Sequence, residues 1–143
     1  GRAPLWYAHQ DFDHGLGHGV GAYLSVHEGP QRLSRASQVP IEPGMILSNE
    51  PGYYREGEFG IRIENLIVAK EASTLPGGDE HRQMLQWRTL TYVPMDKRLI
   101  LSNMLDADSK AWINNYHAET LNKIGPRVSK SAYDWLKLAT KPL

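Results

Sequence analysis

The sequence has no cysteine, no excess of either charge and no long apolar run. Without cysteine, disulfide bonds and thiol catalysis are both excluded. Sixteen basic residues balance sixteen acidic ones, so no long-range field would recruit nucleic acid or an anionic membrane. No apolar stretch approaches the length of a membrane span, and no signal-peptide pattern opens the chain. These absences suit a cytoplasmic protein whose partners are neither nucleic acids nor membranes.

The size and composition are those of an ordinary globular protein. A chain of 143 residues with 41% hydrophobic residues can bury a real core. The pattern predicts strands first and helices last, with the change of character between residues 94 and 106. We therefore expect an α+β fold with a sheet-rich part over residues 1–95 and a helical part over residues 96–143. The chain opens without Met and almost directly on a histidine-rich stretch, which favours a fragment of a longer protein.

The histidine-rich stretch reads H-G-L-G-H-G-V-G from His14. Its glycines disfavour a helix, because each costs about 1 kcal/mol relative to alanine there. A strand would place His14 and His18 on one face and the glycines on the other. Such a glycine face lets a neighbouring element or a ligand approach bare backbone. We therefore predict a strand that presents two imidazoles side by side.

Two further strands bring acidic residues to defined positions. A short apolar run over residues 45–48 leads into Glu50, Pro51 and a glycine. A polar turn over residues 55–60 then precedes Ile61–Ala69, the stretch with the strongest strand pattern in the chain. Alternation along that strand would project Arg62 and Glu64 from one face of an otherwise apolar sheet.

The carboxyl-terminal part has the spacing of two helices. Asp106 or Asp108 can cap the first helix, and Gly125 with Pro126 would end it. A second helix is expected from about Ser129. Residues 85–93 read as one more strand before this helical part.

Three residues on predicted strands or strand ends form a candidate metal site: His18, Glu50 and Glu64. Imidazole together with carboxylates suits Mn, Co or Zn. Each residue also has an ordinary explanation, since His18 could be a hydrogen-bonded core histidine, Glu50 could cap a turn and Glu64 could pair with Arg62. The three together favour a site, because carboxylates on apolar strands are unfavourable unless they are paired or bound to metal.

Four motifs in sequence order carry a family resemblance: H-G-L-G-H-G-V-G, V-H-E-G-P, G-M-I-L-S-N-E-P-G-Y-Y and G-I-R-I-E-N. They resemble motifs of the pita-bread metallopeptidases, and those of Xaa-Pro aminopeptidases more than those of methionine aminopeptidase or prolidase. The later W-I-N-N-Y-H is similar to the carboxy-terminal extension of the three-domain Xaa-Pro aminopeptidases. The resemblance implies the carboxyl-terminal half of a pita-bread (creatinase/aminopeptidase-like) fold, mostly antiparallel sheet, with helices after it.

The resemblance also implies roles for individual residues. His18 and Glu50 would bind one metal ion, and Glu64 would bridge two. His14 and His27 match histidines that face the substrate, orient the scissile peptide and assist proton transfer.

Five residues of these motifs keep open roles. Arg62 matches an arginine close to the metal-binding carboxylates, although it could be only a structural ion pair. Glu50 or a neighbouring carboxylate would handle the proton of the attacking water. Tyr53 and Tyr54 are read as packing residues, and His27 could be an ordinary surface histidine.

The family's site holds two divalent metal ions, for which Mn is the first expectation and Co or Zn the alternatives. It needs two further aspartates, and no segment of this chain matches them. Asp11 and Asp13 lie too close to His14 to replace them and are read as loop residues. We therefore expect the site to be incomplete in this chain, and the chain by itself to be inactive.

The expected activity of the full-length protein is metal-dependent release of the amino-terminal residue from peptides with proline in the second position. A prolidase-type dipeptidase and a non-catalytic pita-bread module that binds protein or peptide remain alternatives. The expected partners are the peptide substrate and either a second copy, in a homodimer, or the missing half. A half-domain would expose apolar surface that its other half covers.

Overall fold

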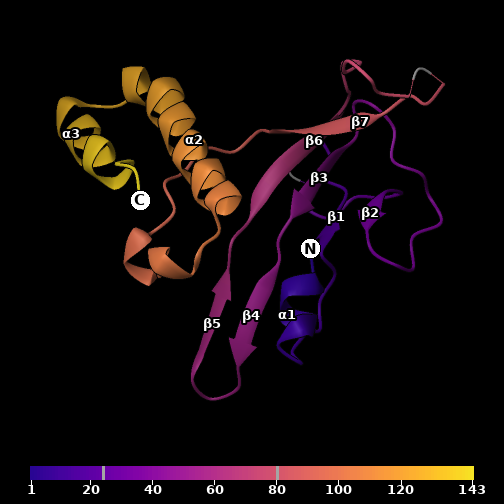
Figure 1. Cartoon of the computed structure of the whole chain (residues 1–143), viewed down its shortest axis with the longest axis horizontal. Coiled ribbons are helices and arrows are strands. Elements are labelled where there is room, and N and C mark those ends of the chain that lie inside the picture. Colours follow the sequence, from indigo (N-terminus) through magenta and orange to yellow (C-terminus); the bar gives the residue numbers. More distant parts are fainter. Residues whose placement is uncertain (24, 80) are drawn as a thin grey trace. The chain divides into compact units, whose positions relative to one another are not determined.

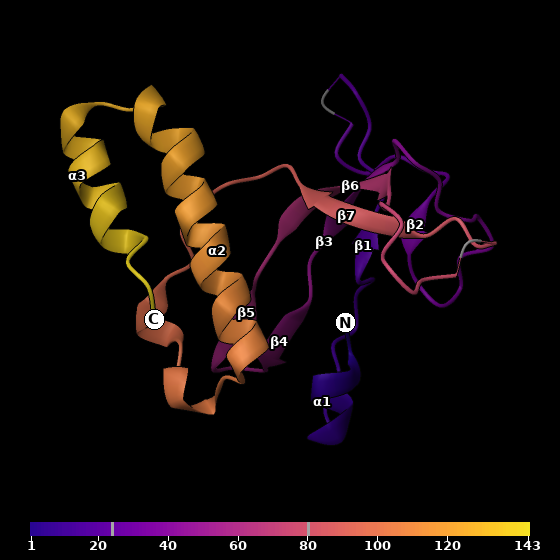
Figure 2. The same cartoon turned by 45° about the horizontal axis from the view of Figure 1, so that its top comes forward.

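The computed structural model describes residues 1–23, 25–79 and 81–143 and divides the chain into two compact units, Gly1–Thr91 and Tyr92–Leu143 (Figures 1 and 2). The first unit holds all the strands, and the second holds the two long helices. The expected mixture of helix and antiparallel sheet is confirmed.

The core of the first unit lies on a three-stranded antiparallel sheet of order β3-β6-β7. The strands are β3 (Ile46–Asn49), β6 (Asn65–Glu71) and β7 (Leu85–Thr89). Leu47 on β3 pairs with Ile67 on β6, and both side chains are buried. The strands predicted over residues 45–48 and 85–93 are therefore present, the second of them shorter than expected.

A hairpin, which forms a separate two-stranded sheet, lies between β3 and β6 along the chain. It consists of β4 (Gly52–Arg55) and β5 (Phe59–Arg62), and the turn predicted over residues 55–60 is confirmed. The single strand predicted over Ile61–Ala69 is wrong, because β5 ends at Arg62 and β6 begins at Asn65. A matching break lies across from it in the same chain, where residues 50–51 separate β3 from β4.

The two ladders on either side of this break keep one register. Asn49 faces Asn65 on one side, and Gly52 faces Arg62 on the other. Residues 50–51 and 63–64 therefore occupy opposite sides of the same interruption. Pro51 cannot donate to a ladder, and its carbonyl instead accepts from the Ile63 N–H at 3.3 Å. The interruption places Glu50 and Glu64 at facing positions.

The histidine-rich stretch is less regular than predicted. The strand expected from His14 onward is limited to β1 (Gly17–His18), which pairs with β2 (Arg32–Leu33). The backbone around it bonds to different partners in turn: Glu50 N–H donates to the Leu16 carbonyl, Gly19 N–H to Gln31 and Val20 N–H to Ile46. The expected close approach is confirmed at Gly17, where a Cβ would overlap the Ser48 carbonyl. Close packing against several neighbours therefore replaces a long ladder.

A short helix, α1 (Ala3–Tyr7), precedes this stretch. In the second unit α2 (Ala107–Ile124) and α3 (Lys130–Ala139) confirm the two predicted helices. Three 3₁₀ turns accompany them: η1 (Lys97–Leu99), η2 (Ser102–Met104) and η3 (Gly125–Arg127). The carboxylate of Asp106 caps α2 by accepting from Ser109 N–H at 2.6 Å.

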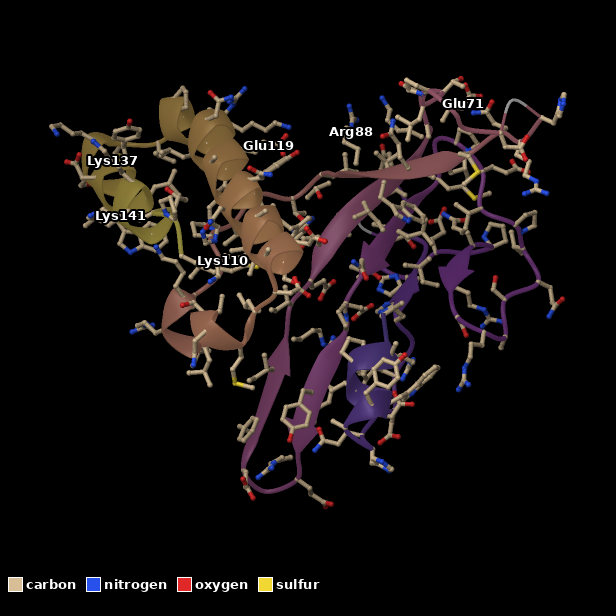
Figure 3. The ribbon with its side chains drawn as sticks, viewed as in Figure 1. Glu71, Arg88, Lys110, Glu119, Lys137 and Lys141 are labelled. Atoms are coloured by element: carbon tan, nitrogen blue, oxygen red, sulfur yellow. The ribbon has the colours of Figure 1, made fainter. Side chains whose placement is uncertain are left out.

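The helices of the second unit are amphipathic. Exposed charges such as Glu119 on α2 and Lys137 on α3 project from the ribbon (Figure 3). The opposite face of α2 buries His117 and Thr120 completely. Among the described residues, no helix combines the length and apolarity needed to cross a membrane.

Candidate active site

Glu50 is the centre of the candidate site in the first unit. It lies in the gap between β3 and β4, and its residue is only 8% exposed. Its Oε1 accepts from the Ser48 hydroxyl at 2.9 Å, and its Oε2 accepts from Arg62 Nη1 at 3.0 Å. Two opposite donors therefore fix the plane of the carboxylate.

His18 faces this carboxylate from β1. Its Nε2 lies 3.2 Å from Glu50 Oε1. Its Nδ1 donates to its neighbour's carbonyl, Gly19 O, at 2.9 Å, which assigns the ring proton to Nδ1 in the neutral imidazole. The lone pair of Nε2 then points at a carboxylate oxygen, an arrangement that needs a proton or a cation between the two atoms.

Ser48 connects the backbone of His18 to Glu50. Its hydroxyl accepts from the His18 N–H at 2.9 Å and donates to Glu50 Oε1, and the residue is completely buried. Ser48 was not among the functional residues predicted from the sequence. A polar residue at a buried strand position, two residues before a carboxylate, was the available signal.

The donors around His18 and Glu50 fit a divalent metal ion. Two ligand atoms that each lie about 2.1 Å from one ion are separated by roughly the 3.2 Å observed here. Histidine ligands usually donate their other ring N–H to a carbonyl or carboxylate, as His18 does to Gly19. Imidazole with carboxylate oxygen suits Mn, Co or Zn. The pair therefore meets the chemical requirements of a partial metal site.

Glu64 is exposed and lies in the strand break that faces Glu50. Within the described ranges, no group of three or more His, Cys, Asp or Glu side chains is close enough to hold a metal ion. The structure thus brings His18 and Glu50 together and leaves the predicted third ligand outside a three-residue cluster. The ion pair considered between Glu64 and Arg62 is replaced by one between Glu50 and Arg62. The ligand role of Glu64 stays a prediction.

Tyr54 joins Arg62 to His14 by hydrogen bonds. Arg62 Nε donates to the Tyr54 hydroxyl oxygen at 2.9 Å, and that hydroxyl donates to His14 Nε2 at 2.6 Å. The direction of the second bond follows from His14 Nδ1, which donates to the Gly15 carbonyl at 2.8 Å. The bond to Tyr54 is the main factor that raises the pKa of Arg62, with smaller contributions from the charges of Glu50 and Glu64.

The hairpin explains why Tyr54 reaches these partners. A Cβ at Gly52 would overlap the Tyr54 hydroxyl, so the ring lies along its own strand over bare backbone. Gly52 is the register partner of Arg62, which places the hydroxyl beside the guanidinium. The expectation that Tyr54 is a packing residue is wrong for this reason. Gly52, two residues before Tyr54, and Gly60, its partner across the hairpin, were the signal in the sequence that the Tyr54 ring could lie over bare backbone.

His27 packs beside His18. Its ring centroid lies 4.1 Å from that of His18, and the residue is exposed. A continuous set of contacts therefore runs from His27 through His18, Glu50 and Arg62 to Tyr54, and from Tyr54 to His14. Asp11 and Asp13 lie outside strands and helices, as expected.

Comparison with known proteins matches both units. Residues 2–71 match metallopeptidase family M24, and residues 83–143 match the C-terminal region of peptidase M24. The chain is 43% identical over 147 residues to a probable Xaa-Pro aminopeptidase P of Talaromyces marneffei and 41% identical over 146 residues to aminopeptidase P1 of Arabidopsis thaliana. Each alignment covers 99% of this chain and 22% of the relative.

A solved structure shows the same fold. The X-prolyl aminopeptidase of Caenorhabditis elegans, described as a cytosolic enzyme with a di-nuclear active site, superposes with a TM-score of 0.85 at 35% identity. The match covers 99% of this chain and 23% of that one. The chain thus spans between a fifth and a quarter of the length of the relatives named here.

Proposed function

Because the chain belongs to metallopeptidase family M24, we propose that it carries part of the active site of a metal-dependent aminopeptidase. The full-length protein would release the amino-terminal residue from peptides with proline in the second position. The observation that carries this proposal is the His18–Glu50 pair, in which Nε2 of the imidazole faces a carboxylate oxygen at 3.2 Å while Nδ1 faces a backbone carbonyl.

His18 Nε2 and Glu50 Oε1 are the proposed ligands to one divalent ion, with Glu64 as the ligand that bridges to a second. The shared register across the strand break supports Glu64, because it puts Glu64 opposite Glu50. Mn is our first choice of metal, with Co or Zn as alternatives. When bound, such ions would lower the pKa of a water molecule and polarise the peptide carbonyl.

The remaining groups of the site position and protonate the substrate. His14 Nε2 already accepts a hydrogen bond from the Tyr54 hydroxyl, so this nitrogen can take up a proton and give it back. His27 lies beside His18 and is open to solvent, which suits a residue that contacts the peptide. Arg62 and Ser48 already occupy both oxygens of Glu50, which favours its role as a ligand over its role in moving the proton.

The surroundings of the site support association with more protein. Phe59, Ile61 and Ile63, at alternate positions on and just after β5, are 40–47% exposed, and exposed apolar side chains that gather in one place mark surfaces that contact other protein. We propose that further protein, either another part of the full-length chain or a second copy in a homodimer, covers them. Cytoplasmic location is part of the same proposal, supported by the description of the Caenorhabditis elegans enzyme as cytosolic.

The test uses the full-length protein with a tripeptide that has proline second, a dipeptide with proline second and a tripeptide without proline. We expect Mn-stimulated cleavage of the tripeptide with proline, and a loss of both bound metal and activity in His18→Ala. Cleavage of the dipeptide alone would replace the proposal with a prolidase. Full-length protein that takes up no stoichiometric Mn, Co or Zn and cleaves none of the three peptides would overturn it in favour of a binding module.

A further inference from the structure

Arg2 contacts three residues of the segment that leads to His14. Its Nη1 donates to Asp11 Oδ1 at 2.5 Å and to the Phe12 carbonyl at 2.7 Å. Its Nη2 donates to the His14 carbonyl. The guanidinium carbon lies 3.8 Å from the centroid of the Phe12 ring, and the Arg2 side chain is only 19% exposed. One side chain therefore holds both ends of residues 11–14.

Asp11 is the second fixed point of this contact set. Its Oδ2 accepts from Trp6 Nε1 at 2.8 Å, and its Oδ1 also accepts from the Phe12 N–H at 2.8 Å. These bonds, with a further contribution from Arg2, lower the pKa of Asp11 to about 2, so the carboxylate is charged at neutral pH. We name Arg2, Trp6 and Asp11 together the Arg2 clasp.

The segment that the Arg2 clasp holds lies outside the sheet. Residues 11–16 belong to no strand or helix, and β1 begins only at Gly17. The ring of His14 packs on Phe12 with the centroids 4.6 Å apart and reaches Tyr54 through Nε2. The position of the imidazole therefore depends on a backbone carbonyl and a neighbouring ring that are both in contact with Arg2.

We propose that Arg2 is a positioning residue, which holds His14 in hydrogen-bonding contact with Tyr54. The inference rests on the proposed function, in which His14 faces the peptide substrate. The guanidinium is suited to this task because its fixed planar fork reaches one carboxylate and two carbonyls from two separate nitrogens, whereas the donors of an ammonium all radiate from one nitrogen. A small displacement of a group beside the reacting atoms can lower the rate by up to about 100-fold.

Arg35 provides a matched control in the same region. It lies over the Trp6 ring at 5.3 Å and lines the same cavity of about 860 Å³ as Arg2 and His14. Removing its charge tests whether any arginine near Trp6 has the proposed effect. We expect Arg35→Gln to behave as the unsubstituted protein.

The experiment is a double-mutant cycle in the full-length protein. Arg2→Gln should lower kcat/KM for a proline-second tripeptide by about 10- to 100-fold, with bound metal unchanged, and Arg2→Lys should not restore it. In a His14→Ala background the same substitution should have no further effect. Equal losses from Arg2→Gln in both backgrounds, or no loss in the first, would overturn the inference.

Two further measurements keep the inference testable. Asp11→Asn removes the charge that anchors the Arg2 fork with almost no change of shape, and it serves if Arg2→Gln does not fold. It should give a smaller loss of activity that also vanishes with His14→Ala, and a loss that persists there would contradict the inference.

The second measurement separates this inference from the proposed function. If the unsubstituted protein cleaves no proline-second peptide, the proposed function fails. A crystal structure of the Arg2→Lys protein then decides the inference alone. A His14 ring displaced from the Tyr54 hydroxyl supports it, and an unmoved ring overturns it.

Discussion

The Tyr54 hydroxyl accepts a hydrogen bond from Arg62 Nε at 2.9 Å and donates one to His14 Nε2 at 2.6 Å. One hydroxyl thus links the arginine that holds Glu50 to a histidine more than thirty residues earlier in the chain. Tyr54 and Arg62 belong to opposite strands of one hairpin. Because of this arrangement, the hairpin connects the Glu50 carboxylate to His14.

Tyr54→Phe tests that connection. The substitution removes the hydroxyl and leaves the ring, so Arg62 and His14 each lose a hydrogen bond worth about 1 kcal/mol. We expect kcat for a proline-second peptide to fall by about 10-fold in the full-length protein, with bound metal unchanged. Tyr53→Phe is the matched control, since the Tyr53 hydroxyl bonds to Arg55 within β4. Equal effects of the two substitutions would contradict the prediction.

Ser48→Ala tests the support of the metal ligands. The change leaves the His18 N–H and Glu50 Oε1 without a shared partner inside a buried site. Groups that orient metal ligands typically contribute about 10- to 100-fold to metal affinity, so we expect a loss of that size. The measurement is titration of the full-length protein with Mn. Ser34→Ala, at an exposed position, should leave affinity unchanged, and an unchanged affinity in Ser48→Ala would count against the proposed ligands.

The helical unit should lose stability in mild acid because of His117. This residue is completely buried, and its Nε2 accepts from the Met95 N–H at 3.0 Å. Burial, followed by the charge of Lys97, lowers its pKa below the ordinary value of 6.5. The unfolded chain therefore binds the proton more readily, so stability is complete above about pH 6.5 and is lost as the pH falls toward the lower folded-state pKa.

Urea unfolding, followed by helical circular dichroism at pH 7.5 and pH 5, checks this sign. His117→Phe should remove much of the difference between the two pH values, while it lowers stability at pH 7.5 by about 1 kcal/mol through the unpaired Met95 N–H. His81→Gln, at an exposed histidine, should leave the difference intact. Higher stability at pH 5 than at pH 7.5 would show the sign to be wrong.

The 143-residue chain by itself should show no peptidase activity. Within its described part no three-ligand cluster is present, so His18 and Glu50 would hold a metal ion only weakly. An assay of the purified chain with a proline-second peptide and excess Mn should give the buffer rate. Measurable cleavage would mean that two donors suffice.

The same chain should self-associate through its exposed hairpin. Phe59, Ile61 and Ile63 each present at least 40% of their surface to solvent. Light scattering at high protein concentration should report species larger than the monomer, and Phe59→Ser with Ile61→Ser should reduce them. A clean monomer of the unsubstituted chain would contradict this expectation.

Local signals were sufficient for the helices and for the hairpin turn. Asp106 and Ser129 precede the two helices, and each accepts the capping bond that its position predicts. Turn residues over 55–60 predict the hairpin for the same reason, because backbone preference acts over a few residues. His14 to Val20 and Ile61 to Ala69 were predicted as unbroken strands, and both are interrupted where the chain changes its hydrogen-bonding partner.

In the candidate site, too, local sequence identified some residues and missed others. Histidines and carboxylates in characteristic motifs identify His18 and Glu50, and the structure brings these two together. The links from Ser48 and Tyr54 to the histidines were not predicted, because His18 and His14 lie 30 and 40 residues away from them along the chain. Such contacts depend on how strands pair, and local periodicity carries no information about that pairing.

The order of amino acids alone determined the element types, the cap positions and the chemical character of the site, since these depend on neighbouring residues. Tertiary structure decided which side chains meet. Arg62 forms its ion pair with Glu50, and Glu64 faces Glu50 across the break between the strands. The reason is the break shared by the two ladders, which exists only once both strands are paired and which ends the alternation that a single strand would predict.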